Sequence, residues 1–393
     1  MNYETMLLDN NQKAFLELLK AGLWADAEST ELRIQGFTES VDWEEVYQLT
    51  AEQSVAGVVL AGIERLKNDN PNFIILQEIL LQWIGEVQII EQQNKAMNEF
   101  VAKLIDKLRK EDVYAVLVKG QGIAQCYEKP LWRVSGDVDL LLSEENYQRA
   151  KKILIPLADD VEQEYKSFKH IGMTLNGEYV VELHGTLHSR LSNRIDRGID
   201  EAQKDVFFGG NVRSWINGST LVFLPAPDNN VIFIFIHILH HFYIEGIGLR
   251  QICDWCRLLW TYKDSLDREL LDIRIRKMGL ITEWKAFAAF AVEYLGMPVE
   301  AMPFYNVRDM NQRSTAERKV KDDVRWKKKA EHILRFVLES GNFGHNREKT
   351  HGKILSAWSK TKDFVRHAKV FPVDSVKFFW HFLWNGVGLM LQK

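Results

Sequence analysis

Two closely spaced aspartates are the residues of this chain best suited to catalysis. Asp137 and Asp139 are separated by one apolar residue and lead into the apolar residues 140–142, a pattern that predicts a buried strand. Side chains alternate between the two faces of a strand, so both carboxylates point to the same side. Neighbouring carboxylates repel each other unless a cation lies between them, and a divalent metal ion is the usual one. The pair therefore predicts a metal-dependent transfer site.

A third carboxylate comes from a predicted hairpin. Residues 168–175 and 178–184 have strand character and flank Asn176-Gly177, a dipeptide typical of a type I′ turn. If the second of these strands lies beside the aspartate strand, Glu182 reaches the same metal ions. Otherwise Glu182 would pair with Lys169 or His170 across the hairpin. We therefore predict that the catalytic residues and the metal ligands are the same three side chains, Asp137, Asp139 and Glu182.

These acids need strands to hold them and a second element to close the site. Residues 113–118 are rich in β-branched side chains and run into Gly120 and Gly122, which predicts a strand followed by a turn and a short helix. Ser143, followed by two glutamates, predicts the start of a helix after the aspartate strand. Strand, helix, strand, helix and hairpin together predict a compact sheet of mixed pairing.

The pattern divides the chain into three regions. Residues 1–110 are expected to be helical because apolar side chains recur near a 3.6-residue spacing. Residues 111–225 alternate between strands and helices and end with a second hairpin around Asn217-Gly218. Residues 226–393 are again helical, beginning with a helix that Asp228 is expected to cap. The predicted fold class is α+β, with a small mixed-sheet core flanked by N-terminal and C-terminal helical regions.

The motifs of the central region resemble those of a known superfamily. Val118-Lys-Gly120, a short helix, Arg133 and then Gly136-Asp-Val-Asp139 are similar to the nucleotidyltransferases that include DNA polymerase β and kanamycin nucleotidyltransferase. A closer resemblance is to a bacterial, uncharacterised nucleotidyltransferase family with an LKG-type turn, an R-x-x-GDxD strand and a later E-x-H. The resemblance covers most of the chain, because further matching segments occur at 92–94, 182–184 and 248–254.

The resemblance implies transfer of a nucleoside monophosphate from an NTP to an acceptor hydroxyl. Two Mg²⁺ or Mn²⁺ ions, held by the three acids, would act on the attacking and leaving oxygens without any covalent nucleophile. The acceptor stays open, since a small molecule, a protein hydroxyl and an RNA end would use the same centre. The residues expected to contact the nucleotide are Lys119, Gly120, Gln121, Arg133, Ser135 and Arg250.

One residue departs from the superfamily pattern. The turn glycine is usually followed by a serine that contacts phosphate, and here Gly120 is followed by Gln121. Lys119, Arg133 and the backbone N–H groups near the turn are the expected substitutes, because amides at a helix start and nearby cations favour phosphate. The departure also leaves open a second class, a non-catalytic nucleotide-binding or regulatory protein with the same fold. Such a protein would bind nucleotide and metal without releasing pyrophosphate.

Histidines leave open a third class. With Glu182, the side chains of His184 and His188 would make a mononuclear metallohydrolase site that retains a transition metal. Three more histidines lie on an apolar segment without nearby acids, so we expect them to be packed or hydrogen-bonded: His237, His240 and His241.

Residues 248–256 allow two interpretations. Arg250 and Asp254 are four residues apart on a predicted helix and would either form a surface ion pair or, as the resemblance implies, contact a phosphate through Arg250 while Asp254 orients it. Cys253 and Cys256 lack the second cysteine pair that a zinc site requires. We expect both cysteines in a helical core.

Composition and charge identify no partner. The chain has 393 residues, 46% of them hydrophobic, and a net charge of −4, which is ordinary for a soluble globular protein. Residues 313–369 hold 16 Lys or Arg against 7 Asp or Glu. This basic stretch would either meet a phosphate-rich partner or an anionic surface, or form a solvated face of the protein. Three cysteines and no secretory signal predict a cytoplasmic location. No segment predicts a membrane span, and we expect residues 376–391 to dock on the protein's own core, not on a membrane surface.

Overall fold

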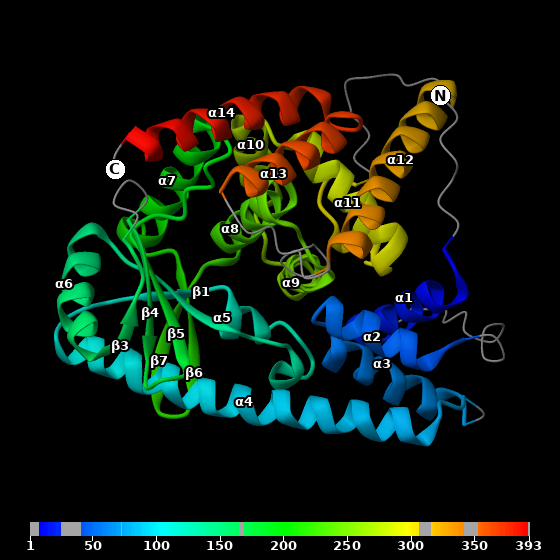
Figure 1. Cartoon of the computed structure of the whole chain (residues 1–393), viewed down its shortest axis with the longest axis horizontal. Helices are drawn as coiled ribbons and strands as arrows, with labels where there is room; N and C mark the ends of the chain where they lie inside the picture. Colours follow the sequence, from blue (N-terminus) through cyan, green and yellow to red (C-terminus); the bar gives the residue numbers. More distant parts are fainter. Residues whose placement is uncertain are drawn as a thin grey trace.

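The fold is that of a computed structural model (Figure 1). It describes the chain at residues 8–24, 41–71, 73–164, 169–305, 316–341 and 353–391. Side chains are described within these ranges except at 316–323, 353–360 and 382–391. The helices that precede the sheet are α1 (Asn10–Leu23), α2 (Trp43–Glu52), α3 (Ala56–Asp69) and α4 (Gln77–Lys110).

A seven-stranded mixed sheet is formed by the described residues, in the order β3-β4-β5-β2-β1-β7-β6. The central strand β2 pairs antiparallel with β1 and parallel with β5. This arrangement confirms the predicted mixed sheet and puts the aspartate strand at its middle. The strands are β1 (Val116–Val118), β2 (Asp137–Leu141), β3 (Ala158–Val161), β4 (His170–Leu175), β5 (Tyr179–His184), β6 (Val212–Asn217) and β7 (Thr220–Pro225).

The two hairpins follow their turn residues. Asn176 and Gly177 have φ angles of 57° and 69°, the positive values that a type I′ turn requires. The loop between β4 and β5 nevertheless has three residues, because Leu175 pairs with Tyr179 and Glu178, predicted to begin the second strand, lies in the loop. The second turn lies one residue later than predicted, because Asn217 pairs with Thr220 and leaves Gly218 and Ser219 as the loop. Strand β1 is shorter than the predicted 113–118, and position 168 of the predicted first hairpin lies outside the described residues.

The helices between the strands are α5 (Gly120–Ala124), α6 (Glu144–Leu154) and α7 (Asn193–Phe208). The last two begin at serine caps, Ser143 and Ser192. As predicted, Ser143 caps α6 by accepting a hydrogen bond from the Asn146 N–H. The predicted cap at Asp228 is wrong, because α8 (Pro227–His240) begins at Pro227 after Ala226. Proline suits the first helical position, since its φ is already helical and it has no N–H to satisfy.

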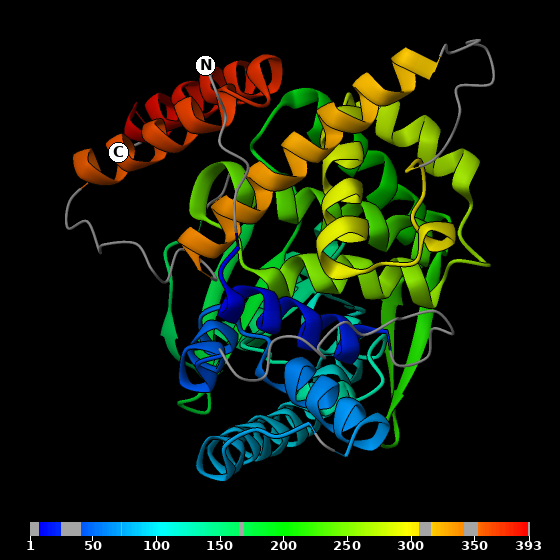
Figure 2. The ribbon, with the colours of Figure 1, turned by 90° about the vertical axis from the view of Figure 1, so that its right-hand side faces the viewer.

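The described residues after α8 are mainly helical, as the sequence predicts. Figure 2 shows α13 and α14 lying side by side, on the far side of the molecule from α4. No described helix is both long and apolar enough to cross a membrane. On α14, Phe378 is buried and its ring lies 4.9 Å from that of Tyr243. The elements are α9 (Leu249–Thr261), α10 (Arg268–Met278), α11 (Ile281–Leu295), α12 (Ala316–Ser340), α13 (Lys353–Ala368), α14 (Pro372–Leu391) and a π-helical turn at His241–Glu245.

Two apolar cores lie on opposite faces of the sheet. Val138 and Leu140 of β2 belong to one core, which the second half of α4 covers through Phe100 and Leu104. Leu141 belongs to the other core, which is built mainly from the N-terminal and C-terminal helices. Because side chains alternate along β2, Asp139 shares the face of Leu141. The alternation therefore directs the carboxylates toward the C-terminal helices, and α4 continues from the N-terminal helices across the opposite face (Figure 1).

Part of the basic stretch gathers around a cavity of about 570 Å³ between α12 and the turn before α14. Residues 313–315 and 342–352 of that stretch lie outside the described residues. Burial, followed by the charges of Arg366 and Arg335, lowers the pKa of His332 in this cavity to about 3. His332 is therefore neutral near pH 7. The basic residues that line the cavity are Arg325, Lys328, Lys329, Arg335 and Lys369.

Candidate active site

A strained turn at the end of β1 presents a lysine to the carboxylates. Lys119 has φ 59° and ψ −151°, a backbone conformation that residues other than glycine rarely adopt. Gly120 follows with φ 40°. This turn places the Lys119 Nζ atom 2.7 Å from Oδ1 of Asp139 on the adjacent strand. Such strain is commonly found at functional sites, where the surrounding structure holds it in place.

The pairing of β2 with β5 brings the three acids together. Asp139 lies directly opposite Glu182 in the parallel register, and Asp137 is two residues earlier on the same face of β2. One carboxylate oxygen from each of Asp137, Asp139 and Glu182 lies within 4.8 Å of the others. Backbone pairing therefore produces the carboxylate cluster.

Mutual charge dominates the electrostatics of the cluster. The charge of Asp139, and then burial, raise the pKa of Asp137. Burial alone would lower the pKa of Lys119, but the charges of Asp139, Glu182 and Asp137 raise it overall. Burial would raise the pKa of Glu182, but hydrogen bonds from His170 and His184 lower it. Three acids, one of them with a raised pKa, share one lysine and two histidines, so the cluster favours added positive charge.

The donor set fits a hard divalent cation. Oδ2 of Asp139 is buried and, among the described residues, accepts no hydrogen bond. A buried carboxylate oxygen without a partner is rare and calls for an explanation such as an ion. Carboxylate oxygens are the ligands that Mg²⁺ prefers. The three acids therefore fit Mg²⁺ and, by the same chemistry, Mn²⁺.

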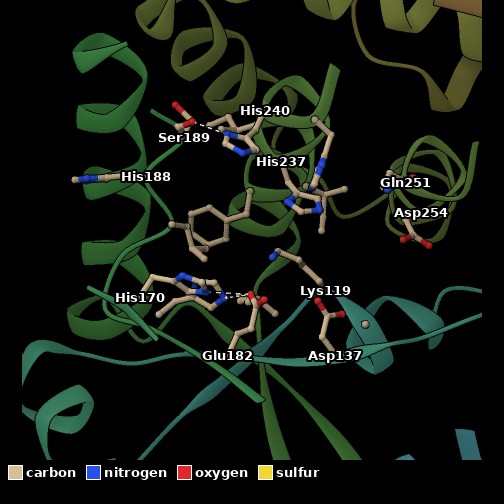
Figure 3. Close-up of a pocket in the computed structure, with 18 of the residues that line it drawn as sticks. Lys119, Asp137, His170, Glu182, His188, Ser189, His237, His240, Gln251 and Asp254 are labelled. Carbon is tan, nitrogen blue, oxygen red and sulfur yellow. Dashed lines mark hydrogen bonds and ion pairs between the residues drawn. The ribbon is translucent and has the colours of Figure 1, made fainter. Parts of the chain in front are cut away.

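A cavity of about 460 Å³ opens between the carboxylate face of the sheet and helices α8 and α9 (Figure 3). Six of the predicted site residues line it: Lys119, Gly120, Arg133, Asp137, Glu182 and Arg250. Three others lie behind this lining. Asp139 is covered, with Lys119 and His184 bonded to its Oδ1 atom, and Gln121 and Ser135 are within hydrogen-bonding distance of each other.

Gln121 and Ser135 belong to a network that fixes the loop before β2. The Gln121 amide donates to Oδ1 of Asn94 on α4 at 3.0 Å, and Asn94 donates to the carbonyls of Leu131 and Arg133, each at 2.8 Å. Gln121, which stands where the superfamily usually has serine, is thus held in a buried position. Its predicted nucleotide contact remains a prediction, and its observed contacts are structural.

Arg133 and Asp254 form a buried ion pair between the GDxD loop and α9. The Arg133 Nη2 and Nε atoms lie 2.5 and 3.0 Å from the two carboxylate oxygens of Asp254, and both residues are only 5% exposed. Tyr127 donates to the same carboxylate at 2.8 Å. Of the two roles considered for Arg250 and Asp254, the surface ion pair is therefore wrong. Arg250 instead donates to the Val134 carbonyl at 2.9 Å and lines the cavity.

Two histidines adjoin the acids. His184, from the E-x-H motif, lies 2.8 Å from Oδ1 of Asp139, and His170 lies 3.3 Å from Oε2 of Glu182. His188, which the metallohydrolase alternative requires, lies 2.7 Å from Asp200 of α7 instead and is turned away in Figure 3. The contact of His170 with Glu182 across the hairpin, one of the two roles expected for Glu182, is therefore present. Leu175 pairs with Tyr179, so the loop has three residues and His170 lies opposite His184, whereas a two-residue Asn176-Gly177 turn would place it opposite Leu183.

His237, His240 and His241, at the end of α8 and in the π-helical turn, are packed or hydrogen-bonded, as predicted, but an acid does lie nearby. His240 Nδ1 donates to the Ser189 carbonyl, 2.8 Å away, and Glu245 lies 3.1 Å from Nδ1 of His241. The sequence interpretation overlooked Glu245, which the π-helical turn brings back toward the helix. His237 lines the cavity, and burial lowers its pKa well below the usual value. Cys253 and Cys256 are buried free thiols in the helical core, as expected.

Comparison with known families settles the wider identity. A family profile described as "Uncharacterised nucleotidyltransferase" matches residues 39–296, which is more than half of the chain and contains all the site residues named above. A search of curated proteins and a search of solved structures each found no match. The match agrees with the resemblance seen in the GDxD and E-x-H motifs. This chain therefore belongs to the family described as uncharacterised nucleotidyltransferases.

Proposed function

We propose that this protein is a Mg²⁺-dependent nucleotidyltransferase that moves a nucleoside monophosphate from an NTP to an acceptor hydroxyl. The observation that carries the proposal is the convergence of Asp137, Asp139 and Glu182, with Lys119 beside them, at one side of a cavity. Membership of the family supports a transferase. The cytoplasmic location expected from the cysteine content is part of the same proposal.

In the proposed reaction the acceptor oxygen bonds to the α-phosphorus while the bond from that phosphorus to pyrophosphate breaks. The hydroxyl proton passes to water as the new bond forms. Bound Mg²⁺ would neutralise phosphate charge and bring the attacking and leaving oxygens into line. The protein's part is to position the reactants and to stabilise charge, which is how most phosphoryl-transfer sites work.

The chain's own residues divide this work. Asp137, Asp139 and Glu182 would hold Mg²⁺, and the lowered pKa of Glu182 keeps that carboxylate ionised as a ligand must be. Lys119 neutralises Asp139 in the absence of nucleotide and would turn its ammonium group to a phosphate when the nucleotide binds. The buried pair of Arg133 and Asp254 would hold the GDxD loop against α9.

The direct test is label transfer. Purified protein is incubated with labelled NTPs, Mg²⁺ or Mn²⁺ and a cell extract that supplies acceptors, and both labelled product and pyrophosphate are measured. The proposal expects both to appear and both to disappear when EDTA removes the metal. Binding of nucleotide and metal without pyrophosphate release would instead identify the protein as the non-catalytic alternative.

Lys119→Met should weaken nucleotide use without unfolding the protein. A hydrogen bond to a charged group is worth about 1.5–3 kcal/mol, so we expect the KM for NTP to rise by about 10- to 100-fold. The matched control is Lys129→Met, because Lys129 is an exposed lysine paired with Glu64 outside the cavity. Steady-state kinetics at saturating Mg²⁺ measures both variants. An equal KM for NTP in the two would show that Lys119 does not bind phosphate.

A further inference from the structure

A second group of possible metal ligands lies beside the carboxylates and differs from them chemically. In the hairpin register, His170 on β4 is directly opposite His184 on β5. Glu182 precedes His184 by two residues and therefore shares its face of the strand. The two imidazole rings stack with centroids 4.8 Å apart. These backbone relationships gather three side chains on one face of a two-stranded segment.

The donor atoms of this group point to a common position. Nε2 of His170 and Nε2 of His184 each lie 3.3 Å from the same oxygen, Oε2 of Glu182. One donor atom from each of the three residues lies within 4.8 Å of the others. The side chains of His170, His184 and Glu182 are 19%, 10% and 27% exposed, in that order. All three residues line the cavity. The group is therefore held by the sheet and open on one side.

Two imidazoles and one carboxylate select a different metal from three carboxylates. Imidazole nitrogen suits Zn²⁺ and other first-row transition metals, whereas an all-oxygen set suits Mg²⁺. Three protein ligands with an open fourth position are characteristic of zinc sites that bind water or substrate. Glu182 belongs to both groups. The two metal preferences thus meet at one carboxylate.

We propose that His170, Glu182 and His184 form a transition-metal site, for an ion such as Zn²⁺, that shares Glu182 with the Mg²⁺ site. An ion bound there takes Glu182 away from the oxygen-only cluster. The ion also competes with Asp139 for His184, because the His184 Nε2 atom lies 2.8 Å from Oδ1 of Asp139 in this structure. Occupancy by Zn²⁺ therefore inhibits nucleotidyl transfer. Binding of the ion is independent of the proposed function, whereas the inhibition rests on it.

The binding test uses Co²⁺, whose visible absorption reports its coordination, on the whole chain without nucleotide. We expect wild type and Asp137→Asn to bind Co²⁺ with a four-coordinate spectrum that Zn²⁺ abolishes by displacement. His170→Gln should bind at least about 100-fold more weakly, since even outer-shell partners of metal sites are worth 10–100-fold in affinity. His188→Gln is the matched control, because His188 bonds to Asp200, and it should behave as wild type. Equal Co²⁺ affinity in His170→Gln and wild type would overturn the site.

A second readout needs no variant. In the unmodified protein, Zn²⁺ should shift the imidazole NMR resonances of His170 and His184. Shifts confined to other histidines would overturn the proposal even if His170→Gln did not fold.

The inhibition is tested separately as the ratio of transfer with and without Zn²⁺ at fixed Mg²⁺. This ratio should fall well below one in wild type and return toward one in His170→Gln. An unchanged wild-type ratio would contradict inhibition. Absence of transfer in wild type with Mg²⁺ alone would refute the proposed function and leave the Co²⁺ result standing.

Discussion

Asp139→Asn will abolish nucleotidyl transfer while the protein stays folded. The substitution keeps the shape and one oxygen of the side chain but removes the charge that a metal ligand supplies. We expect transfer to fall by at least about 10³-fold, because loss of a single electrostatic contact in an active site commonly costs 10²–10³-fold and here a metal ligand is lost. Label transfer measures the activity, and circular dichroism checks the fold.

The control for this variant is Asp160→Asn, the same change on strand β3 at the edge of the same sheet, where the side chain is exposed. It should keep full activity. Asp137→Asn should behave as Asp139→Asn does, since both carboxylates belong to the cluster. Transfer that persists in Asp139→Asn at the level of Asp160→Asn would show that the reaction does not use this cluster.

Arg133→Met will cause the largest loss of stability that we expect from a single substitution near the site. Methionine keeps much of the volume but leaves Asp254 buried without its guanidinium partner, and Tyr127 is then the one remaining donor to it among the described side chains. Breaking a buried ion pair from one side costs about 3–5 kcal/mol, because an uncompensated charge stays in the interior. Urea unfolding measures the change in the free energy of unfolding.

Two further variants separate the ion pair from general damage. Lys129→Met removes the exposed pair with Glu64 and should cost at most about 1 kcal/mol. Arg133→Met combined with Asp254→Leu removes both charges and should recover a large part of the loss, as replacement of buried pairs by apolar residues often does. A cost for Arg133→Met no larger than that for Lys129→Met would contradict the structural role given to this pair.

The meeting of the three acids could be predicted in large part from short-range rules. Alternation along a strand puts Asp137 and Asp139 on one face, and the Asn176-Gly177 dipeptide predicts a hairpin whose second strand carries Glu182. Only the pairing of β5 with β2 had to be assumed, and the structure contains that pairing. Helix starts marked by a side-chain cap, such as Ser143, were predictable for the same local reason.

Features that depend on long-range packing could not be predicted in the same way. The partner of Asp254 is Arg133, 121 residues earlier, whereas sequence spacing suggested Arg250, four residues away. His188 pairs with Asp200 because α7 packs beside its loop, and no periodicity reveals that contact. The exact place of His170 also depends on more than the turn dipeptide. A two-residue Asn176-Gly177 turn predicts His170 opposite Leu183, and the third loop residue, Glu178, moves it opposite His184.

The central claim is that Asp137, Asp139 and Glu182 gather divalent metal around a bound triphosphate. The most direct measurement is a crystal structure with Mn²⁺ and a non-hydrolysable NTP, in which anomalous scattering locates the metal. We predict Mn²⁺ in contact with these three carboxylates and with the phosphates of the nucleotide in the cavity. Nucleotide bound in the cavity with Mn²⁺ elsewhere, or with Asp139 still covered by Lys119, would contradict the account.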